Sequence, residues 1–322
     1  MEYRSKILGI FNQKGGVGKT TMASVIAEYA AVVKHLSVLV VDLDMQCNSS
    51  DYWVGMESAP GEPGGQLPPP HPDYEEYQDG LNIDERSTIA DIFYGKAVMP
   101  YETFINDSNG YKGYVDIMLG HPRLLEEVCT EYDNASGKIA SQIVTRVGEF
   151  LHLPDIQESY DLIILDTGPT RNPVFRSALR AATHAVIPFE LEEKSKQGIN
   201  AMLHVIQNEN YARSGAGNEL KLIGLIPNKV RQQTALHSNS LEELHDTLGD
   251  LMCPSDVYLP LAVAFPERDI KGISPKSIFN IGKSHKARQH AERVGEYVLE
   301  KLDLECPTLG HPDQTAETAQ HD

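Results

Sequence analysis

The sequence predicts an α/β fold, a mostly parallel and twisted sheet of about seven to eight strands with helices on both faces. Three observations lead to this prediction. A glycine-rich loop at 13–21 lies between an apolar run and a segment whose apolar residues recur at helical spacing. Two later apolar runs, 37–44 and 160–166, each end in aspartate. Continuous apolar runs of this kind are typical of central parallel strands that helices cover on both faces.

The chain begins with a strand at 7–11, the glycine-rich loop and a helix at 22–33. This order is the context of a phosphate-binding loop, so we expect a P-loop NTPase. The glycines let main-chain N–H groups turn toward phosphate oxygens, and the helix adds the positive end of its dipole. The nucleotide-binding residues expected here are Gly15, Gly16, Val17, Gly18, Lys19, Thr20 and Thr21. A glycine-rich turn with two solvated lysines is the alternative, and the flanking strand and helix argue against it.

The two lysines of the loop have different expected roles. Lys19 should reach the outer phosphates, and Thr20 should give a hydroxyl oxygen to Mg²⁺, because hard cations take oxygen ligands. The usual pattern G-x-x-x-x-G-K-[ST] has glycine where this chain has Gln13, which is followed by Lys14. A cation this early in the loop cannot easily share the position of Lys19. We therefore expect Lys14 to point across an interface toward the nucleotide of another subunit.

Carboxylates end two of the predicted strands, Asp42 and Asp44 the first and Asp166 the second. The carboxyl ends of parallel strands form the ligand crevice of such sheets, so these groups should face the phosphates. One of the first pair can hold Mg²⁺ through water while the other orients an attacking water. The alternative for this pair is two acids that cap the next turn. Asp166 has the position of a Walker B acid that binds Mg²⁺ through water, and the loop at 167–170 can then sense the γ-phosphate.

Residues 55–85 differ in composition from the rest of the chain. They include six prolines, five glycines and eight acidic residues, with no Lys or Arg. Such a stretch is not expected to bury a core, so we predict a stiff surface linker that hangs near the mouth of the nucleotide site. A polyproline ligand at 67–72 is the alternative.

The rest of the chain continues the alternation of strands and helices. The expected elements are a short helix at 87–95, a strand at 115–120, a helix at 123–150 broken near 134–137, a strand at 185–189, a helix at 194–211, a strand at 222–228, a short strand at 256–260 and a helix beyond 284. Ser87 should cap the short helix and Gly95 should end it. Asn228 stands at a strand end and offers an adenine edge both a donor and an acceptor, unless it is a plain turn asparagine. Pro260 could pack on the base.

A local excess of positive charge lies at 267–293. The segment has seven Lys or Arg residues against three acids, which gives +4 within a chain of net charge −18. It can neutralise several DNA phosphates without reading bases, although a solvated helix face explains the composition equally well. The candidates for DNA contact are Lys271, Lys276, Lys283, Lys286 and Arg288. The helix that follows carries Glu296 and Glu300 at its far end, which argues against anchoring on an anionic membrane.

Length and composition limit the number of domains, the location of the protein and the use of its cysteines. The 322 residues suffice for one large α/β domain, expected at 1–302, followed by a polar and disordered tail at 303–322. No apolar run approaches the roughly 20 residues that span a bilayer, and the glycine loop comes too early for a secretory signal, so we expect a cytoplasmic protein. The four cysteines contain no C-x-x-C pair and support neither a zinc ribbon nor a disulfide framework.

Three motifs together resemble the ParA/MinD family of deviant Walker A ATPases, and most of all its plasmid and chromosome partition branch. The motifs are Lys14–Thr20, Asp42–Gln46 and Asp166–Pro169. In that branch the second motif usually reads D-x-D-P-Q-G-N, whereas this chain has Met45 and Cys47 in place of the proline and the glycine. The resemblance runs from about residue 6 to 302 and weakens over 55–85, where family members usually have a shorter connection.

The resemblance implies that Lys14 contacts the partner subunit's ATP in a sandwich homodimer and that Asp44 positions the hydrolytic water. It implies that Asp42 and Asp166 lie around Mg²⁺. Proteins similar to this one coat nonspecific DNA when bound to ATP. They are released when a ParB-like partner on a centromere site stimulates slow hydrolysis, so the expected location is the nucleoid.

Four other functions compete with this expectation. A ParA-like ATPase that positions a protein cargo would have nearly the same sequence. A MinD-like membrane-cycling regulator needs a C-terminal basic amphipathic helix, and an electron-transferring reductase of the same fold needs paired cysteines. The sequence lacks both signals. A metabolic ligase of the superfamily would reveal itself by substrate-dependent ATP hydrolysis.

Overall fold

The computed structural model describes residues 5–106, 112–135, 137–192, 195–213, 218–231, 235–268 and 277–304, with 235–240 described by their backbone alone. The strands are β1 (Lys6–Ile10), β2 (Ser37–Leu43), β3 (Glu57–Ser58), β4 (Gln66–Leu67), β5 (Tyr101–Glu102), β6 (Tyr114–Met118), β7 (Leu162–Thr167), β8 (His184–Glu190) and β9 (Lys221–Asn228). The α-helices are α1 (Lys19–Glu28), α2 (Asn48–Trp53), α3 (Tyr74–Tyr77), α4 (Pro122–Asn134), α5 (Gly137–Leu151), α6 (Pro154–Ser159), α7 (Pro173–Ala181), α8 (Ser195–Arg213), α9 (Ala235–Leu248), α10 (Ala264–Glu267) and α11 (Lys286–Lys301).

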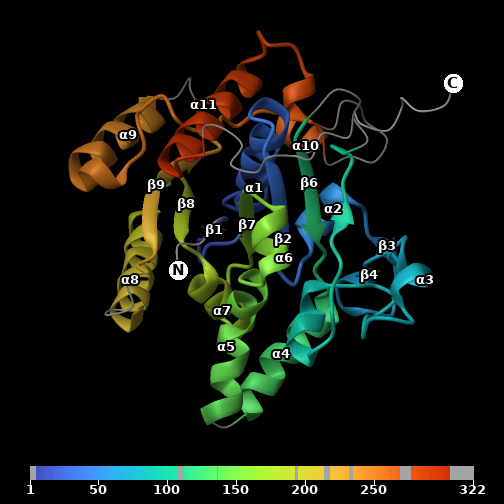
Figure 1. Ribbon diagram of the computed structural model, residues 1–322. Coiled ribbons are helices and arrows are strands. Elements are labelled where there is room, and N and C mark those ends of the chain that lie inside the picture. The colour runs from blue at the N-terminus through green and yellow to red at the C-terminus, as the bar shows by residue number, and fades with distance from the viewer. Residues whose placement is uncertain are drawn as a thin grey trace, which may run out of the picture.

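Seven strands form one sheet in the order β5-β6-β2-β7-β1-β8-β9, which is parallel except for the short edge strand β5. Successive residues of a strand face opposite layers: Leu8 and Val40 pack under α1 and α11, whereas Ile7 and Leu39 pack on α4, α5, α7 and α8. Figure 1 shows α11 above the sheet and α5, α7 and α8 below it. The predicted sheet with helices on both faces is confirmed.

The register of the central strands brings the predicted site residues to one edge. Asp42 of β2 lies opposite Asp166 of β7, and Ile10 of β1 lies opposite Asp166 on the other side. The loop at 13–18 follows β1 directly, so it leaves the sheet beside both carboxylates. The carboxyl ends of these three strands therefore form one crevice, as the parallel arrangement predicts.

Two predicted elements differ in the structure. The helix expected at 87–95 is a 3₁₀ helix at 89–94, and its cap is Thr88 rather than Ser87, because Asp91 accepts hydrogen bonds from the main-chain N–H and the hydroxyl of Thr88. Gly95 ends it, as predicted. The strand expected at 256–260 is wrong. Pro260 makes only an isolated bridge to Val230, and a proline has no N–H with which to continue a ladder.

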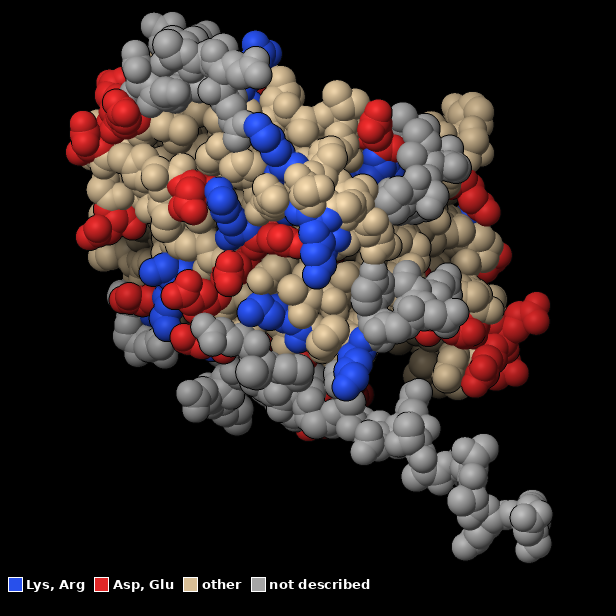
Figure 2. Space-filling view, turned by 90° about the horizontal axis from the view of Figure 1, so that it is seen from above, with Lys and Arg blue, Asp and Glu red and all other residues tan. Residues whose placement is uncertain are grey.

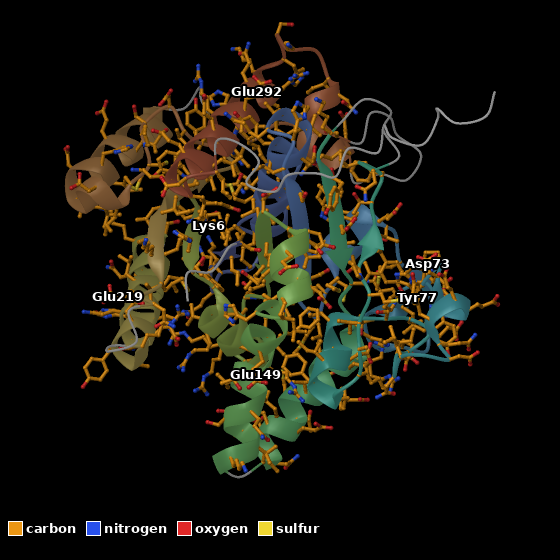
Figure 3. All side chains as sticks on the ribbon, in the orientation of Figure 1. Lys6, Asp73, Tyr77, Glu149, Glu219 and Glu292 are labelled. Atoms are coloured by element: carbon orange, nitrogen blue, oxygen red, sulfur yellow. The ribbon has the colours of Figure 1, made fainter. Side chains whose placement is uncertain are left out.

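The stretch at 55–85 is a folded appendage, so the prediction of a linker that buries nothing is wrong. It contains the antiparallel pair β3 and β4 and the short helix α3. His71 is buried: its ring lies 4.4 Å from the ring of Tyr101, and its Nε2 lies 3.1 Å from the Pro100 carbonyl. Figure 3 shows Asp73 and Tyr77 at the outer end of the appendage. Prolines and glycines suit a linker as well as a series of turns, and here they wrap the chain against the edge of the sheet.

Other expectations hold or lie outside the described part. The break predicted near 134–137 separates α4 from α5, and the helix predicted at 194–211 is α8. Of the predicted tail, only Asp303 and Leu304 are described, so a single domain at 1–302 with a disordered tail stays a prediction. None of the helices in the described ranges combines the length and the apolar character that crossing a bilayer requires.

Candidate nucleotide site

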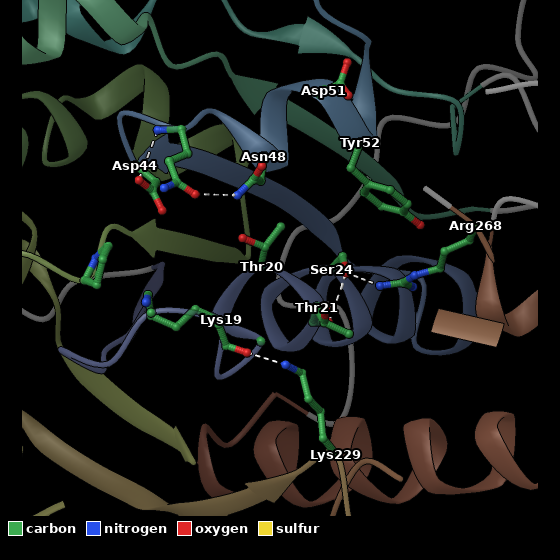
Figure 4. Close-up of a pocket in the computed structure, with 15 residues that line it drawn as sticks. Lys19, Thr20, Thr21, Ser24, Asp44, Asn48, Asp51, Tyr52, Lys229 and Arg268 are labelled. Atoms are coloured by element: carbon green, nitrogen blue, oxygen red, sulfur yellow. Dashed lines mark hydrogen bonds between the residues drawn. The ribbon is translucent and has the colours of Figure 1, made fainter. Parts of the chain in front are cut away.

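A cavity of about 400 Å³ opens over the glycine-rich loop and the start of α1 (Figure 4). It is lined by Gly15, Gly16, Gly18, Lys19, Thr20, Thr21, Ser24, Asp44, Gln46, Asn48, Asp51, Tyr52, Pro169, Lys229 and Arg268. The loop residues predicted to bind nucleotide are in this set, except Val17, which is buried beneath it. Segments far apart in sequence thus contribute to one cavity.

The conformation of the loop requires glycine at one position for two reasons. Gly18 has φ +81°, in the left-handed region, and a Cβ there would lie 2.1 Å from Nδ2 of Asn228. Nδ2 of Asn228 donates to the carbonyl of Val17 at 2.7 Å, and its Oδ1 accepts the main-chain N–H of Lys229 at 2.8 Å. Asn228 therefore holds the loop in place, a role that sequence reasoning missed. Its predicted contact with adenine stays a prediction.

Lys19 lies in the cavity with little solvent exposure. Burial lowers the pKa of its ammonium group, while the carboxylates of Asp166 and Asp44 act in the opposite direction. A buried cation at the start of a helix, beside main-chain N–H groups, is suited to bind an anion with several charged oxygens.

Three oxygen-bearing side chains meet at the ends of β7, α1 and α2. Oδ2 of Asp166 accepts hydrogen bonds from the hydroxyl of Thr20 at 2.6 Å and from that of Ser49 at 2.7 Å. The other oxygen of this fully buried carboxylate, Oδ1, has no hydrogen-bond partner among the described residues. Burial raises the pKa of the Asp166 carboxyl above its usual range. An unpaired oxygen beside two hydroxyls is a donor set that fits Mg²⁺, and Ser49 was not predicted to belong to it.

Asp42 and Asp44 have different surroundings. Asp42 is fully buried, and its Oδ2 accepts hydrogen bonds from the N–H and the hydroxyl of Ser50 at 2.8 and 2.7 Å. Its Oδ1 accepts the main-chain N–H of Asp44 at 3.2 Å. Burial and the nearby Asp166 raise the pKa of Asp42 well above its usual range. Asp42 thus fixes the turn that presents Asp44 to the cavity, and its predicted contact with Mg²⁺ stays a prediction.

Asp44 lies against the loop that follows β7. A Cβ placed on Gly168 would be 3.1 Å from Oδ1 of Asp44, so this glycine allows the close approach. Asp44 also accepts the main-chain N–H of Gln46 at 3.1 Å. The carboxylate predicted to position water and the loop predicted to sense the γ-phosphate are therefore neighbours.

Two lysines near the glycine-rich loop form ion pairs with carboxylates at the end of β8 and just after it. Nζ of Lys14 pairs with Glu192, both side chains being well exposed. Lys229 pairs with Glu190 at 2.8 Å and donates to the carbonyl of Gly16. Exposed pairs of this kind contribute little to stability, so either lysine can exchange its carboxylate for a phosphate at little cost. The contact of Lys14 with another subunit stays a prediction.

Arg268 was assigned by composition to the basic segment, but the structure places it in the wall of the cavity. Its guanidinium donates to Glu28 at 2.7 Å and to the hydroxyl of Ser24, and it lies 4.8 Å from the centre of the Tyr52 ring. Both members of the Arg268–Glu28 pair are buried. The same carboxylate accepts the hydroxyl and the main-chain N–H that start the segment at 277–281.

The remaining predicted residues are not brought together. Lys271 and Lys276 lie outside the described residues. Lys283 and Lys286 are exposed, but Arg288 is partly buried, pairing with Glu292 and donating to the Ile281 carbonyl. Figure 2 shows Lys and Arg interspersed with Asp and Glu on the face that it views, not one continuous basic patch. Pro260 does not line the cavity.

Comparison with known proteins shows the family to which the chain belongs. A family model described as an AAA domain matches residues 5–214. The chain is 25% identical over 302 residues to the protein IncC of Escherichia coli, covering 93% of this chain and 70% of IncC. It is also 25% identical over 268 residues to the chromosome-partitioning ATPase Soj of Thermus thermophilus, covering 81% of this chain and 87% of Soj. The chain belongs to the ParA/MinD family.

Solved structures share the ParA/MinD fold with this chain at low sequence identity. An ATP complex of a Cyanothece McdA variant has a TM-score of 0.67 at 17% identity, covering 94% of this chain and 97% of McdA. The structure of pNOB8 ParA bound to nonspecific DNA has a TM-score of 0.62 at 19% identity, covering 93% and 99%. A cobyrinic acid a,c-diamide synthase of Mycobacterium smegmatis has the same TM-score at 18% identity, covering 96% and 100%. Fold likeness alone therefore does not separate a partition ATPase from a synthase.

Proposed function

We propose that this ParA/MinD family member is a partition-type ATPase of the nucleoid that uses ATP and Mg²⁺. In this proposal it closes as a homodimer over two nucleotides and binds DNA without sequence preference. It leaves the DNA when a ParB-like centromere-binding partner stimulates hydrolysis. The observation that carries the proposal is the meeting of Lys19, Thr20 and Asp44 in one cavity, with the buried Asp166 hydrogen-bonded to Thr20. The loop of this cavity also carries Lys14.

The chain's own groups divide the work of hydrolysis. The loop N–H groups and Lys19 hold the phosphates, and Asp44 orients the attacking water from the side of Gly168. Bound Mg²⁺ would supply positive charge to the phosphate oxygens, held by Thr20 and by Asp166. We expect slow turnover by the single chain, because Lys14 pairs with Glu192 of its own subunit and a second subunit has to supply the partner phosphate.

Dimer formation follows from the position of Lys14. Its side chain is well exposed and does not line the cavity, whereas that of Lys19 is buried in it. From there its ammonium group can bind a phosphate that approaches on a facing subunit. Two of the similar solved structures support the ligands of the proposal: McdA is in complex with ATP, and pNOB8 ParA is bound to nonspecific DNA.

Sedimentation velocity with ADP, ATP and a slowly hydrolysed analogue, each with and without nonspecific duplex DNA, tests the proposal. The expected result is a monomer with ADP, a dimer with ATP or the analogue, and cosedimentation of the dimer alone with DNA. A monomer under every condition would contradict it. Dimers that ignore DNA would instead point to a protein cargo, and dimers that bind anionic liposomes would point to a membrane-cycling regulator. Hydrolysis that requires a small carboxylic acid would indicate a ligase.

A further inference from the structure

Helix α7 carries an unusual charge pattern for this acidic chain. Its nine residues include two arginines, Arg176 and Arg180, and no acid, and Arg171 comes two residues before its start. The two helical arginines are four positions apart and so lie on the same face. The opposite face, with Phe175 and Leu179 at its border, packs into the core.

A groove of about 370 Å³ lies between α5, α7 and α8. Figure 1 shows these three helices in the lower part of the molecule. Its floor includes Phe175, Leu179 and Val205, which are apolar. Arg171, Arg176 and Arg180 also line it. We call this feature the arginine groove. It is separate from the nucleotide cavity, with which it shares no lining residue.

Two arginines of the groove, Arg171 and Arg176, are hydrogen-bonded to uncharged groups. Arg171 donates to the Ala201 carbonyl at 3.3 Å, and Arg176 donates to the hydroxyl of Tyr132 at 2.5 Å. Neither acceptor is charged. Each contact takes one of the five N–H donors of a guanidinium and leaves others for a ligand.

The third arginine shares its carboxylate. Arg180 pairs with Glu209 at 2.6 Å, but Glu209 also pairs with the buried Arg213 at 2.9 Å. One carboxylate therefore faces two guanidinium groups at this end of the groove. Together with Arg171 and Arg176, this gives the groove a clear excess of positive charge in a chain of net charge −18.

We propose that the arginine groove binds an acidic segment of a protein partner, with an apolar side chain on the floor and carboxylates on the arginines. Guanidinium groups bind carboxylates through two parallel hydrogen bonds, and an amphipathic helix is the common occupant of a groove between helices. DNA is the less suitable ligand, because a phosphate backbone has no apolar group to cover Val205, the partly exposed apolar residue of the floor. The charge and the apolar floor of the groove are therefore complementary to an acidic, amphipathic helix.

The position of α7 gives such a partner a route to the nucleotide site. Only residues 167–172 separate Asp166 from the start of α7, and Asn172 caps the helix by accepting the N–H of Phe175 at 2.7 Å. A partner that fixes α7 also restrains the loop beside Asp44 and Asp166. Binding itself needs no nucleotide, so the inference stands or fails separately from the proposed ATPase cycle.

The test is fluorescence anisotropy with a labelled helical peptide about four turns long, which presents Leu on one face with Glu on both sides of it. The full chain without nucleotide should bind this peptide and not the same peptide with Gln for Glu. Arg176→Gln with Arg180→Gln should weaken binding about tenfold or more, equivalent to about 1.4 kcal/mol. Arg146→Gln, which removes an exposed arginine of α5 outside the groove, is the matched control and should bind like the parent.

Three results would overturn the proposal. They are no binding of the acidic peptide, equal losses in the Arg146 and Arg176/Arg180 variants, and displacement of the peptide by duplex DNA. The variant Arg176→Lys with Arg180→Lys tests whether the loss is specific. Lysine keeps the positive charge but cannot form the bidentate hydrogen bonds of a guanidinium, so this variant should bind the peptide more tightly than the glutamine variant and less tightly than the parent. Thermal melting of each variant shows whether it is folded.

Discussion

Glu28 gives the sharpest test of how the nucleotide cavity is held together. Its carboxylate is fully buried and is surrounded by donors: Arg268 and the Tyr52 hydroxyl on Oε1, and the Ser277 hydroxyl and the Ile278 N–H on Oε2. In Glu28→Gln one oxygen becomes an NH₂ group. Whichever oxygen is replaced, that NH₂ meets either Arg268 or the Ile278 N–H, and neither can accept a hydrogen bond.

The size of the effect follows from the buried guanidinium that loses its counter-charge. Breaking a buried pair by removing one partner costs about 3–5 kcal/mol. With an unfolding entropy of about 2.1 cal/mol/K per residue, the 322 residues give about 0.7 kcal/mol/K, so Tm should fall by about 4–7 °C. ATP affinity should fall as well, because Arg268 and Ser24 line the cavity.

Differential scanning calorimetry and nucleotide titration measure the two effects. Glu209→Gln is the matched control, since Glu209 also pairs with a buried arginine, Arg213, but lies outside the nucleotide cavity. It should lower Tm and leave ATP affinity unchanged. A Tm for Glu28→Gln within about 1 °C of the parent would refute the reasoning, as would equal losses of ATP affinity in both variants.

Three further predictions address catalysis, DNA contact and pH. Asp44→Ala should bind ATP and dimerise yet hydrolyse slowly, by about a hundredfold or more, since it removes the group that orients water; single-turnover rates near normal would exclude this role. Lys283→Glu with Lys286→Glu should weaken DNA binding and flatten its salt dependence while ATP affinity stays unchanged; an unaltered salt slope would place the DNA surface elsewhere. Burial, with Lys6 and Lys221 nearby, lowers the pKa of His184 to about 4. The unfolded chain takes up this proton near pH 6.5, so stability should fall from pH 6.5 to 4, and His184→Gln should show a shallower fall in denaturant titrations; parallel profiles would contradict this.

The sequence predicted those features of the site that depend on short stretches of chain. The glycine loop adjoins its flanking strand and helix, and each strand-end aspartate adjoins its own apolar strand, so the geometry of each stretch follows from local rules. Asp42 and Asp166 could be placed together because parallel strands end at a common edge.

The missed features depend on contacts between distant residues. Asn228 bonds to a loop 211 positions earlier, and Arg268 pairs with a carboxylate 240 positions earlier. No local pattern separates such residues from a turn asparagine or a surface arginine. Ser49 is the exception that could have been found, because its hydroxyl comes only five residues after Asp44, which follows the strand next to that of Asp166. The appendage was missed because composition does not show whether prolines pack against a sheet edge.

The central claim is that two chains close over two nucleotides through Lys14, and one measurement tests it most directly. The molar mass of the parent chain and of Lys14→Ala should be determined by light scattering with a slowly hydrolysed ATP analogue. The account predicts a dimer for the parent, and a monomer that retains the nucleotide for the variant. A parent chain that stays monomeric with bound nucleotide, or a variant that dimerises as well as the parent, would contradict it.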